Sequence, residues 1–274
     1  MSNLSELLPA GAGAKSADFV ASGTLGSGVT VALKADGTVE AVTGRTGGTG
    51  TAAIFETGLT RDVSIACDSA NSKIVIGYRD DSNGGYGTSV VGTVSGTTIT
   101  FGTPTTYVSS ATDYTIVVFD ANSGKYVFFY RSASNLGIAR VGTVSGTSIS
   151  FGAEATFNNA DSLYIAASYD STNNKSVVCF RDGTPVTFNT SGTTNNITAV
   201  FDSTNNKVVL AYLDVTPDTG YAIVGTVSGT SISFGSEVDM GVGPISYTSG
   251  AFDASVGKVA IVYRADTTEY GTLI

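Results

Sequence analysis

An aspartate followed five residues later by a lysine recurs along this chain, each time between two short apolar segments. The five pairs are Asp68/Lys73, Asp120/Lys125, Asp170/Lys175, Asp202/Lys207 and Asp253/Lys258. An Asp side chain accepts hydrogen bonds from the N–H groups of a following turn. The spacing therefore predicts a β-strand, a four-residue turn and a second strand in every copy, and it restricts the chain to a repeat-built fold.

A second block, Val-Gly-Thr-Val-Ser-Gly-Thr followed by an Ile and a Phe-Gly pair, follows three of these pairs. It occupies residues 91–102, 141–152 and 224–235. Its Ser-Gly dipeptide fits a two-residue hairpin turn, because glycine accepts a positive φ without steric cost. A complete repeat thus contains four antiparallel strands, as does the blade of a β-propeller.

The third repeat is short and the two ends of the array look complementary. Successive repeat aspartates are 52, 50, 32 and 51 residues apart, so the third repeat has lost a strand, which we expect to be the third of its four. Residues 270–274 match only the start of a third strand, whereas residues 50–55 resemble an outer strand that precedes the first repeat. We therefore predict an all-β fold, a roughly five-bladed β-propeller with one abbreviated blade and a ring closed by an N-terminal strand.

The first part of the chain does not follow the repeat. Segments 28–34 and 39–42 flank an Ala-Asp-Gly-Thr turn and predict a β-hairpin, and residues 43–50 form a Gly/Thr-rich linker. We predict an N-terminal β-hairpin extension and linker over residues 1–47 and a propeller over residues 48–274. The hairpin either attaches the chain to a partner or packs against the disc, and the sequence leaves both alternatives open.

The N-terminal segment resembles a known group of proteins. Residues 4–13 (LSELLPAGAG), 19–23 (FVASG) and 31–39 (VALKADGTV) look like the start of predicted virion proteins from marine tailed phages. Those proteins are similar in also carrying Gly-Thr-Val-Ser-Gly repeats. The resemblance implies a protein of the particle surface, either a capsid decoration or a tail fibre, and it carries over no catalytic residue.

Charge and hydropathy exclude several classes of partner. The formal net charge is −9 and the pI about 4.4, and no cluster of Lys and Arg offers a basic face to phosphates, which argues against nucleic acid. The N-terminus has no basic segment followed by an apolar one, so no signal peptide is predicted. No apolar stretch approaches the roughly 20 residues that span a bilayer, so no membrane insertion is expected.

Catalytic and metal-binding motifs are not evident. The chain contains no histidine, and Cys67 and Cys179 lack the spacing of a metal or redox motif, so we interpret both as buried free thiols. Residues 80–85 are similar to a calcium loop but lack its later glutamate. We predict no catalytic residue, no metal and no cofactor.

The strongest enzymatic alternative is a five-bladed glycoside hydrolase-like enzyme. Asp62, Asp113 and Asp161 each stand six to nine residues before a repeat aspartate, where a first strand begins, and Asn196 takes the matching later position. Such enzymes use a pair of carboxylates. The absence of tryptophan and of a glutamate on an inner strand instead favours polar residues that merely begin strands.

An arginine follows the second strand in four of the five repeats. The four are Arg79, Arg131, Arg181 and Arg264, and Leu213 takes the fifth position. They either pair with acidic residues as part of the repeat or form a ring that binds an anionic ligand.

The candidate ligand-binding residues lie on the loops that follow the second strands, because loops vary while the scaffold is kept. They are Asp80, Asp81, Asn83, Tyr86, Asn135, Asp214, Asp218 and Tyr221. We predict a non-enzymatic phage virion surface protein, made in the host cytoplasm, that contacts other virion proteins through residues 1–45 and binds a host-surface glycan or receptor. The alternatives are the hydrolase and a passive capsid-stabilising protein, and a homo-oligomer is neither required nor forbidden.

Overall fold

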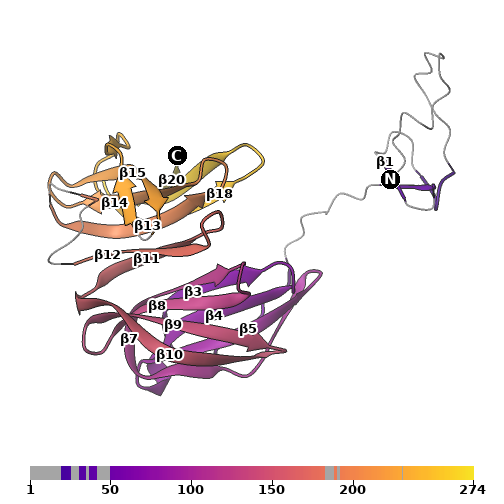
Figure 1. The fold of residues 1–274 in the computed structure, drawn as a ribbon, viewed down its shortest axis with the longest axis horizontal. Helices are drawn as coiled ribbons and strands as arrows, with labels where there is room; N and C mark the ends of the chain where they lie inside the picture. The colour runs from indigo at the N-terminus through magenta and orange to yellow at the C-terminus, as the bar shows by residue number, and fades with distance from the viewer. Residues whose placement is uncertain are drawn as a thin grey trace, which may run out of the picture. The chain divides into compact units, whose positions relative to one another are not determined.

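The computed structural model describes residues 20–25, 31–34, 37–41, 50–182, 188–189, 192–229 and 231–274. The chain divides into two compact units, Met1–Gly50 and Thr51–Ile274. The described residues form antiparallel β-sheets, none of them closed, and contain no α-helix (Figure 1). None of their helical segments could cross a membrane.

In the N-terminal unit, the predicted hairpin is present. Strand β1 (Val31–Leu33) pairs antiparallel with β2 (Val39–Ala41), and Gly37 in the turn has a φ of 81°. Val39 also forms a parallel bridge with Ala21. Residues 1–19 and 42–49, which hold most of the predicted attachment segment and linker, lie outside the described residues.

Repeats 1 and 2 are complete. Repeat 1 consists of β3 (Thr60–Asp68), β4 (Lys73–Asp80), β5 (Tyr86–Ser95) and β6 (Thr98–Phe101). Repeat 2 consists of the second half of β7 (Thr105–Asp120), followed by β8 (Lys125–Ser132), β9 (Leu136–Ser145) and β10 (Ser148–Asp161). The first half of β7 pairs with β5, so the two repeats share one eight-stranded sheet.

Repeats 3 to 5 vary around the same plan. Repeat 3 has β11 (Leu163–Asp170) and β12 (Lys175–Arg181); repeat 4 has β13 (Thr194–Asp202), β14 (Lys207–Asp214), β15 (Thr219–Ser228), β16 (Ser231–Phe234) and β17 (Val238–Asp239); repeat 5 has β18 (Ile245–Asp253), β19 (Lys258–Ala265) and β20 (Tyr270–Leu273). If only its third strand were lost, as the sequence predicts, repeat 3 would keep its outer strand. The described residues of repeat 3 form only two strands, and the Phe188 ring lies 5.1 Å from that of Tyr212 in repeat 4.

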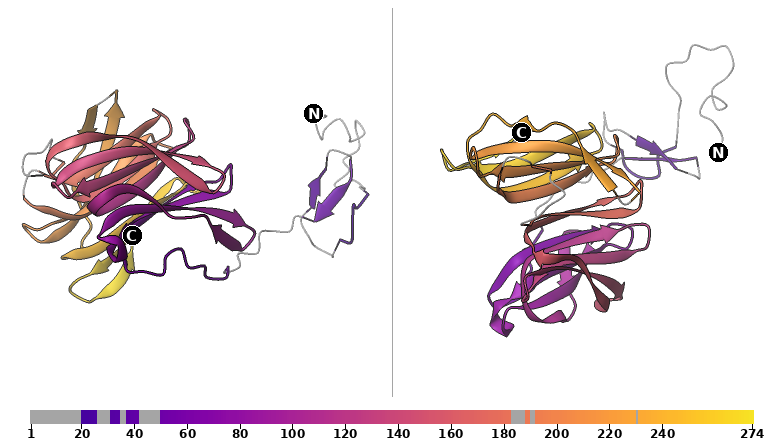
Figure 2. Two further views of the ribbon diagram at one scale, coloured as in Figure 1. Left: turned by 90° about the horizontal axis from the view of Figure 1, so that it is seen from below. Right: turned by 60° about the vertical axis from the view of Figure 1, so that its left-hand side comes forward.

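The first strands of the five repeats pack in sequence. β3 lies against β7, β7 against β11, β11 against β13, and β13 against β18. Figure 1 labels these strands, and Figure 2 gives two further views of the same ribbon. Among the described strands, β20 pairs only with β19. The row is therefore open, and its two ends are repeats 1 and 5.

The prediction that an N-terminal strand closes the ring is wrong. Residues 50–55 form no strand, and the Phe55 ring instead packs 5.3 Å from that of Tyr78 and 6.2 Å from that of Phe101 in repeat 1. Phe55 takes the place that Phe188 takes beside Tyr212 and Phe234 in repeat 4. The aromatic side chain of this segment thus fills a core position in repeat 1, and its backbone extends no sheet.

The aspartate-lysine turns form as predicted. Asp68 Oδ1 accepts the N–H groups of Ala70 and Asn71 at 3.1 and 3.2 Å, and the equivalent aspartates of the other repeats make matching bonds. In repeats 1, 2 and 4 the lysine Nζ donates at 2.8 Å to the threonine of the Gly-Thr-Val-Ser-Gly block. The two sequence motifs are therefore one hydrogen-bonded unit, and Lys175 and Lys258, whose repeats lack that block, are exposed.

Cys179 is buried and free as predicted, but Cys67 is exposed, which corrects the expectation that both thiols are buried. Cys67 lies on the face of β3 that points away from repeat 2. No preceding repeat covers this face, because β3 begins the row.

Candidate functional site

Each first strand contains a β-bulge at which a residue other than glycine adopts a positive φ. The five residues are Asp62 (49°), Tyr114 (55°), Tyr164 (50°), Asn196 (50°) and Tyr247 (52°), and each stands six residues before the repeat aspartate. The strand register shifts at the same place in every repeat. We call these five residues the bulge row.

Backbone strain makes the bulge row a candidate site. Asp and Asn tolerate the left-handed region, but a tyrosine there is an outlier that surrounding structure must hold in place. Bulges redirect side chains and are over-represented beside functional sites. Three of the five positions carry a tyrosine, so the repeat bears this strain at one defined place.

The tyrosines of the bulge row have aromatic and cationic neighbours. The rings of Tyr114 and Tyr164 are 5.4 Å apart, and the Arg181 guanidinium lies 4.8 Å from the centre of the Tyr164 ring. The Arg264 guanidinium lies 5.1 Å from the Tyr247 ring, and Tyr247 is 76% exposed. Partial burial, with added contributions from Tyr164 and Asp113, raises the pKa of Tyr114, so its hydroxyl stays protonated at neutral pH.

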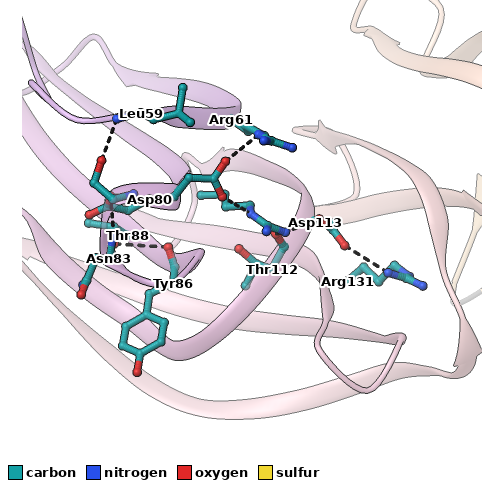
Figure 3. A network of polar contacts seen from close by, with 12 residues as sticks. Leu59, Arg61, Asp80, Asn83, Tyr86, Thr88, Thr112, Asp113 and Arg131 are labelled. Atoms are coloured by element: carbon teal, nitrogen blue, oxygen red, sulfur yellow. Dashed lines mark hydrogen bonds and ion pairs between the residues drawn. The ribbon is translucent and has the colours of Figure 1, made fainter.

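An ion-pair network runs beside the first two members of the row, Asp62 and Tyr114. Figure 3 shows its stretch from Arg61 to Arg131. It alternates Arg61, Asp81, Arg79, Asp113, Arg131 and Asp161, with nitrogen–oxygen distances of 2.5, 2.6, 2.6, 3.1 and 2.7 Å in that order. Three arginines balance three aspartates. We call this set the ionic ladder, and it links repeat 1 to repeat 2 and to the end of β10.

The ladder assigns a structural role to two of the four recurrent arginines. Arg79 bonds Asp113 of the next repeat, and Arg131 bonds both Asp113 and Asp161. Arg181 likewise donates to Asn195 Oδ1 of repeat 4 at 2.6 Å, whereas Arg264 pairs with Asp266 of its own repeat. Two of these arginines, Arg79 and Arg181, thus bridge neighbouring repeats, whereas Arg131 and Arg264 bond residues of their own repeats.

The carboxylates considered for hydrolysis are in different surroundings. Asp113 and Asp161 are paired with arginines in the ladder, while Asp62 is half-buried and accepts the Tyr114 N–H. Burial, and then the nearby charge of Asp113, raises the pKa of Asp62. The repeat alignment also differs from the one expected: Asp62 and Asn196 are equivalent, but Tyr114 and Tyr164, not Asp113 and Asp161, occupy their position.

Four of the eight predicted ligand-binding residues lie in repeat 1. Asp80 Oδ1 accepts the N–H groups of Ser82 and Asn83 at 3.0 and 3.1 Å and caps a short 3₁₀ helix, Asp81–Asn83. Asp81 belongs to the ladder, Asn83 is exposed, and Tyr86 is half-buried at the start of β5. Figure 3 shows this corner together with the part of the ladder from Arg61 to Arg131.

The other four are divided between repeats 2 and 4. Asn135 and Asp218 are exposed at turn tips, with φ values of 69° and 70°. Asp214 is fully buried and accepts the Thr216 N–H at 2.9 Å, which places it away from the surface. The Tyr221 ring stacks on that of Tyr212 at 6.3 Å.

The turns that follow the second strands in repeats 1 and 2 are tied to the following first strands. Thr112 N–H donates to Gly85 O at 3.1 Å, and Ser162 N–H donates to Asn135 O at 3.0 Å. Both donors stand two residues before a bulge tyrosine. The predicted loops and the bulge row therefore share one end of these repeats.

Sequence reasoning missed the bulge row because a positive φ leaves no general compositional mark. The constant spacing of six residues before the repeat aspartate was the available signal. Within the described part of the chain, no three His, Cys, Asp or Glu side chains are grouped so that they could hold a metal ion. No protein-family model matches the chain, and a search of curated proteins returns no match to its sequence.

Proposed function

We propose that this chain is a non-enzymatic surface protein of a phage particle, a capsid decoration or a tail fibre, that binds a host-surface glycan at the bulge row. The observation that carries the proposal is the recurrence of strained tyrosines at one position of three of the five first strands. A tyrosine ring offers an apolar face and a polar edge, which match the two faces of a sugar ring. Strain retained in several repeats indicates a use for these side chains.

The neighbouring polar side chains suit the same ligand. Asn83, Asn135 and Asp218 are exposed on the turns that follow the second strands, and Tyr247 projects into solvent. Amide and carboxylate groups supply the directed hydrogen bonds with which a site selects one hydroxyl pattern. The arginines of the ladder are neutralised by aspartates, which favours an uncharged ligand over an anionic one.

The scaffold in this proposal is a propeller-type row of five blades whose ring is left open within a single chain. The successive packing of the first strands supports it, because first strands line the axis of a propeller. Residues 1–45 attach the chain to other virion proteins. Its place on the virion surface rests on the resemblance of the N-terminal segment, and passive stabilisation of a capsid is the alternative in which no glycan binds.

The test compares two equally exposed tyrosines of repeat 5. Tyr247 in the bulge row is 76% exposed and Tyr270 on β20 is 74% exposed. We expect Tyr247→Ala to weaken binding to a glycan array or to host cells about tenfold, the loss typical of one stacking contact. Tyr270→Ala is the matched control and should bind as the wild type does.

Three outcomes would contradict the proposal. Equal loss in both variants would place the ligand outside the bulge row. Absence of binding to any glycan or host cell, with retained binding to empty capsids, would favour the stabiliser. Turnover of a glycan that Asp62→Asn abolishes, with the fold intact, would establish the hydrolase.

A further inference from the structure

The two ends of the row of repeats carry apolar side chains that no neighbouring repeat covers. On β3, Val63, Ile65 and Cys67 point away from repeat 2, and Val63 and Ile65 are 52% and 58% exposed. We call these three residues the β3 face. The position of Ile65 is taken in repeat 2 by Val117, which is buried against repeat 1 and only 4% exposed.

The opposite end shows the complementary surface. Ser249 and Ala251 on β18 and Val262 on β19 are exposed, and we call them the β18 face. Their equivalents in repeat 1 are Ser64, Ala66 and Gly77, counted from the repeat aspartate and lysine. All three of these contact or face Val117 of repeat 2.

Internal junctions show how such faces fit together. Val117 N–H donates to Ser64 Oγ at 3.0 Å. Val117 also packs directly on Gly77, since a Cβ atom added to Gly77 would lie only 2.7 Å from Val117 Cγ2. At the junction of repeats 4 and 5, Val200 Cγ2 would lie 2.6 Å from a Cβ on Gly250. Gly250 is equivalent to Ile65, and Val200 to Ala251. The smaller side chain at Ala251 leaves room for Ile65 on the β18 face.

From this equivalence we propose that the β3 face of one copy of this chain packs onto the β18 face of a second copy, which continues the row of repeats head to tail. Four internal junctions already use this interface, and the same chain carries both of its unpaired halves. A second copy is the occupant because β3 and β18 lie in different sheets of the chain and both faces remain exposed. Identical heterologous contacts build either a cyclic oligomer or a filament.

Charge at the rim of the joint is mixed. Arg61, whose side chain is 65% exposed, lies near the start of β3 and takes the position that Asp113 holds in repeat 2. Arg264 takes the position of Arg79, which bonds Asp113, so the joint brings the two arginines together. Asp266, the equivalent of Asp81, lies beside Arg264 and offsets part of their charge.

A disulfide trap tests the contact in the full-length chain. The double variant combines Ile65→Cys, at the position equivalent to Gly250, with Ala251→Cys, at the position equivalent to Val200, because Gly250 and Val200 touch at the junction of repeats 4 and 5. Cys67→Ser is added to remove the exposed native thiol. Cys179 does not interfere, because burial raises the pKa of its thiol to about 12. Under mild oxidation we expect the double variant to form a series of disulfide-linked oligomers on non-reducing gels. Each single variant should form no covalent product larger than a dimer.

Two outcomes of the trap would overturn the proposal. A product with the mass of one chain but a shifted mobility would mean that the row closes on itself. A double variant that gives no more than the dimers of the single variants, at high protein concentration, would mean that the faces do not meet.

A second measurement needs no engineered cysteine. We expect light scattering to give the wild-type chain a mass at least twice that of a monomer at high concentration, and Ile65→Asp to return it to a monomer with unchanged circular dichroism. Val256→Asp, which changes an exposed valine outside both faces, is the control. A wild-type chain that stays monomeric would overturn the proposal, and neither result bears on glycan binding.

Discussion

The junction between repeats 1 and 2 and the junction between repeats 4 and 5 hold the same two parts of neighbouring repeats together by different interactions. At the first, Arg79 ends the second strand and bonds Asp113 of the next repeat. At the second, Leu213 holds the position of Arg79, is buried, and packs in one cluster with Ile245, Ile261 and Tyr263. When the arginine is lost, the next repeat supplies an apolar partner instead of a carboxylate.

This difference shows that the repeats keep a contact at this position while the residue types that make it change. Both junctions join the end of a second strand to the start of the next first strand. The ionic version is partly exposed and therefore sensitive to pH and salt, whereas the apolar version excludes water and is not. The two junctions should accordingly respond to different perturbations.

The largest effect is expected at the apolar junction. Ile245 is fully buried between repeats 4 and 5, so Ile245→Ala removes packed methyl groups and leaves a cavity. We expect it to lower the free energy of unfolding by about 3 kcal/mol, measured by chemical denaturation. Leu273→Ala, on a side chain that is 68% exposed, should change it by less than about 0.5 kcal/mol. Equal effects of the two substitutions would refute the apolar junction.

A smaller effect is expected at the ionic junction. Asp113→Asn removes the charge that both Arg79 and Arg131 share, and the side chain of Asp113 is 38% exposed. After allowance for solvent screening, the loss should be about 1 kcal/mol and should shrink at high ionic strength. Asp218→Asn, at an exposed turn, is the control for the change of net charge. A loss that is independent of salt would show that Asp113 acts by packing.

The smallest effect should have the opposite sign. Because burial raises the pKa of Asp62, the folded state holds its proton more tightly than the unfolded chain does. Stability from this group is present below the ordinary carboxyl pKa and is lost as the pH rises through the folded pKa. Asp62→Asn should thus raise the free energy of unfolding at pH 7, by less than about 1 kcal/mol.

The pH profile of Asp62→Asn provides the check. Its advantage over the wild type should disappear at acid pH, where Asp62 is protonated. The salt-bridged Asp81 behaves conversely: its hydrogen bond from Arg79 lowers its pKa, so its contribution is present above the ordinary carboxyl pKa and is lost as the pH falls through the folded value. A variant that is less stable than the wild type at pH 7 would contradict the assignment to Asp62.

Much of the fold could be predicted from sequence, but less of the candidate site. The strand order within repeats 1, 2 and 4 followed from the aspartate-lysine turn and the Ser-Gly hairpin. The closing strand was predicted wrongly, because the Ile-Phe pair of residues 54 and 55 has the same apolar pattern whether its backbone pairs or only Phe55 packs. The candidate carboxylates were matched to the wrong positions, since polarity alone does not reveal the bulge at Tyr114 and Tyr164.

The sequence by itself determined the local units. Asp68 bonds the backbone of the turn that follows it, and Lys73 bonds the neighbouring hairpin, so these partners all lie close in sequence. The same residue types therefore form the same turn in each repeat. Tertiary structure alone decided which equivalent positions are buried. Ile65 and Val117 are alike in type and in repeat position, yet one is exposed and the other is covered. Burial depends on what packs against a strand from outside its own repeat, and the residues of a strand do not specify by themselves which repeat covers them.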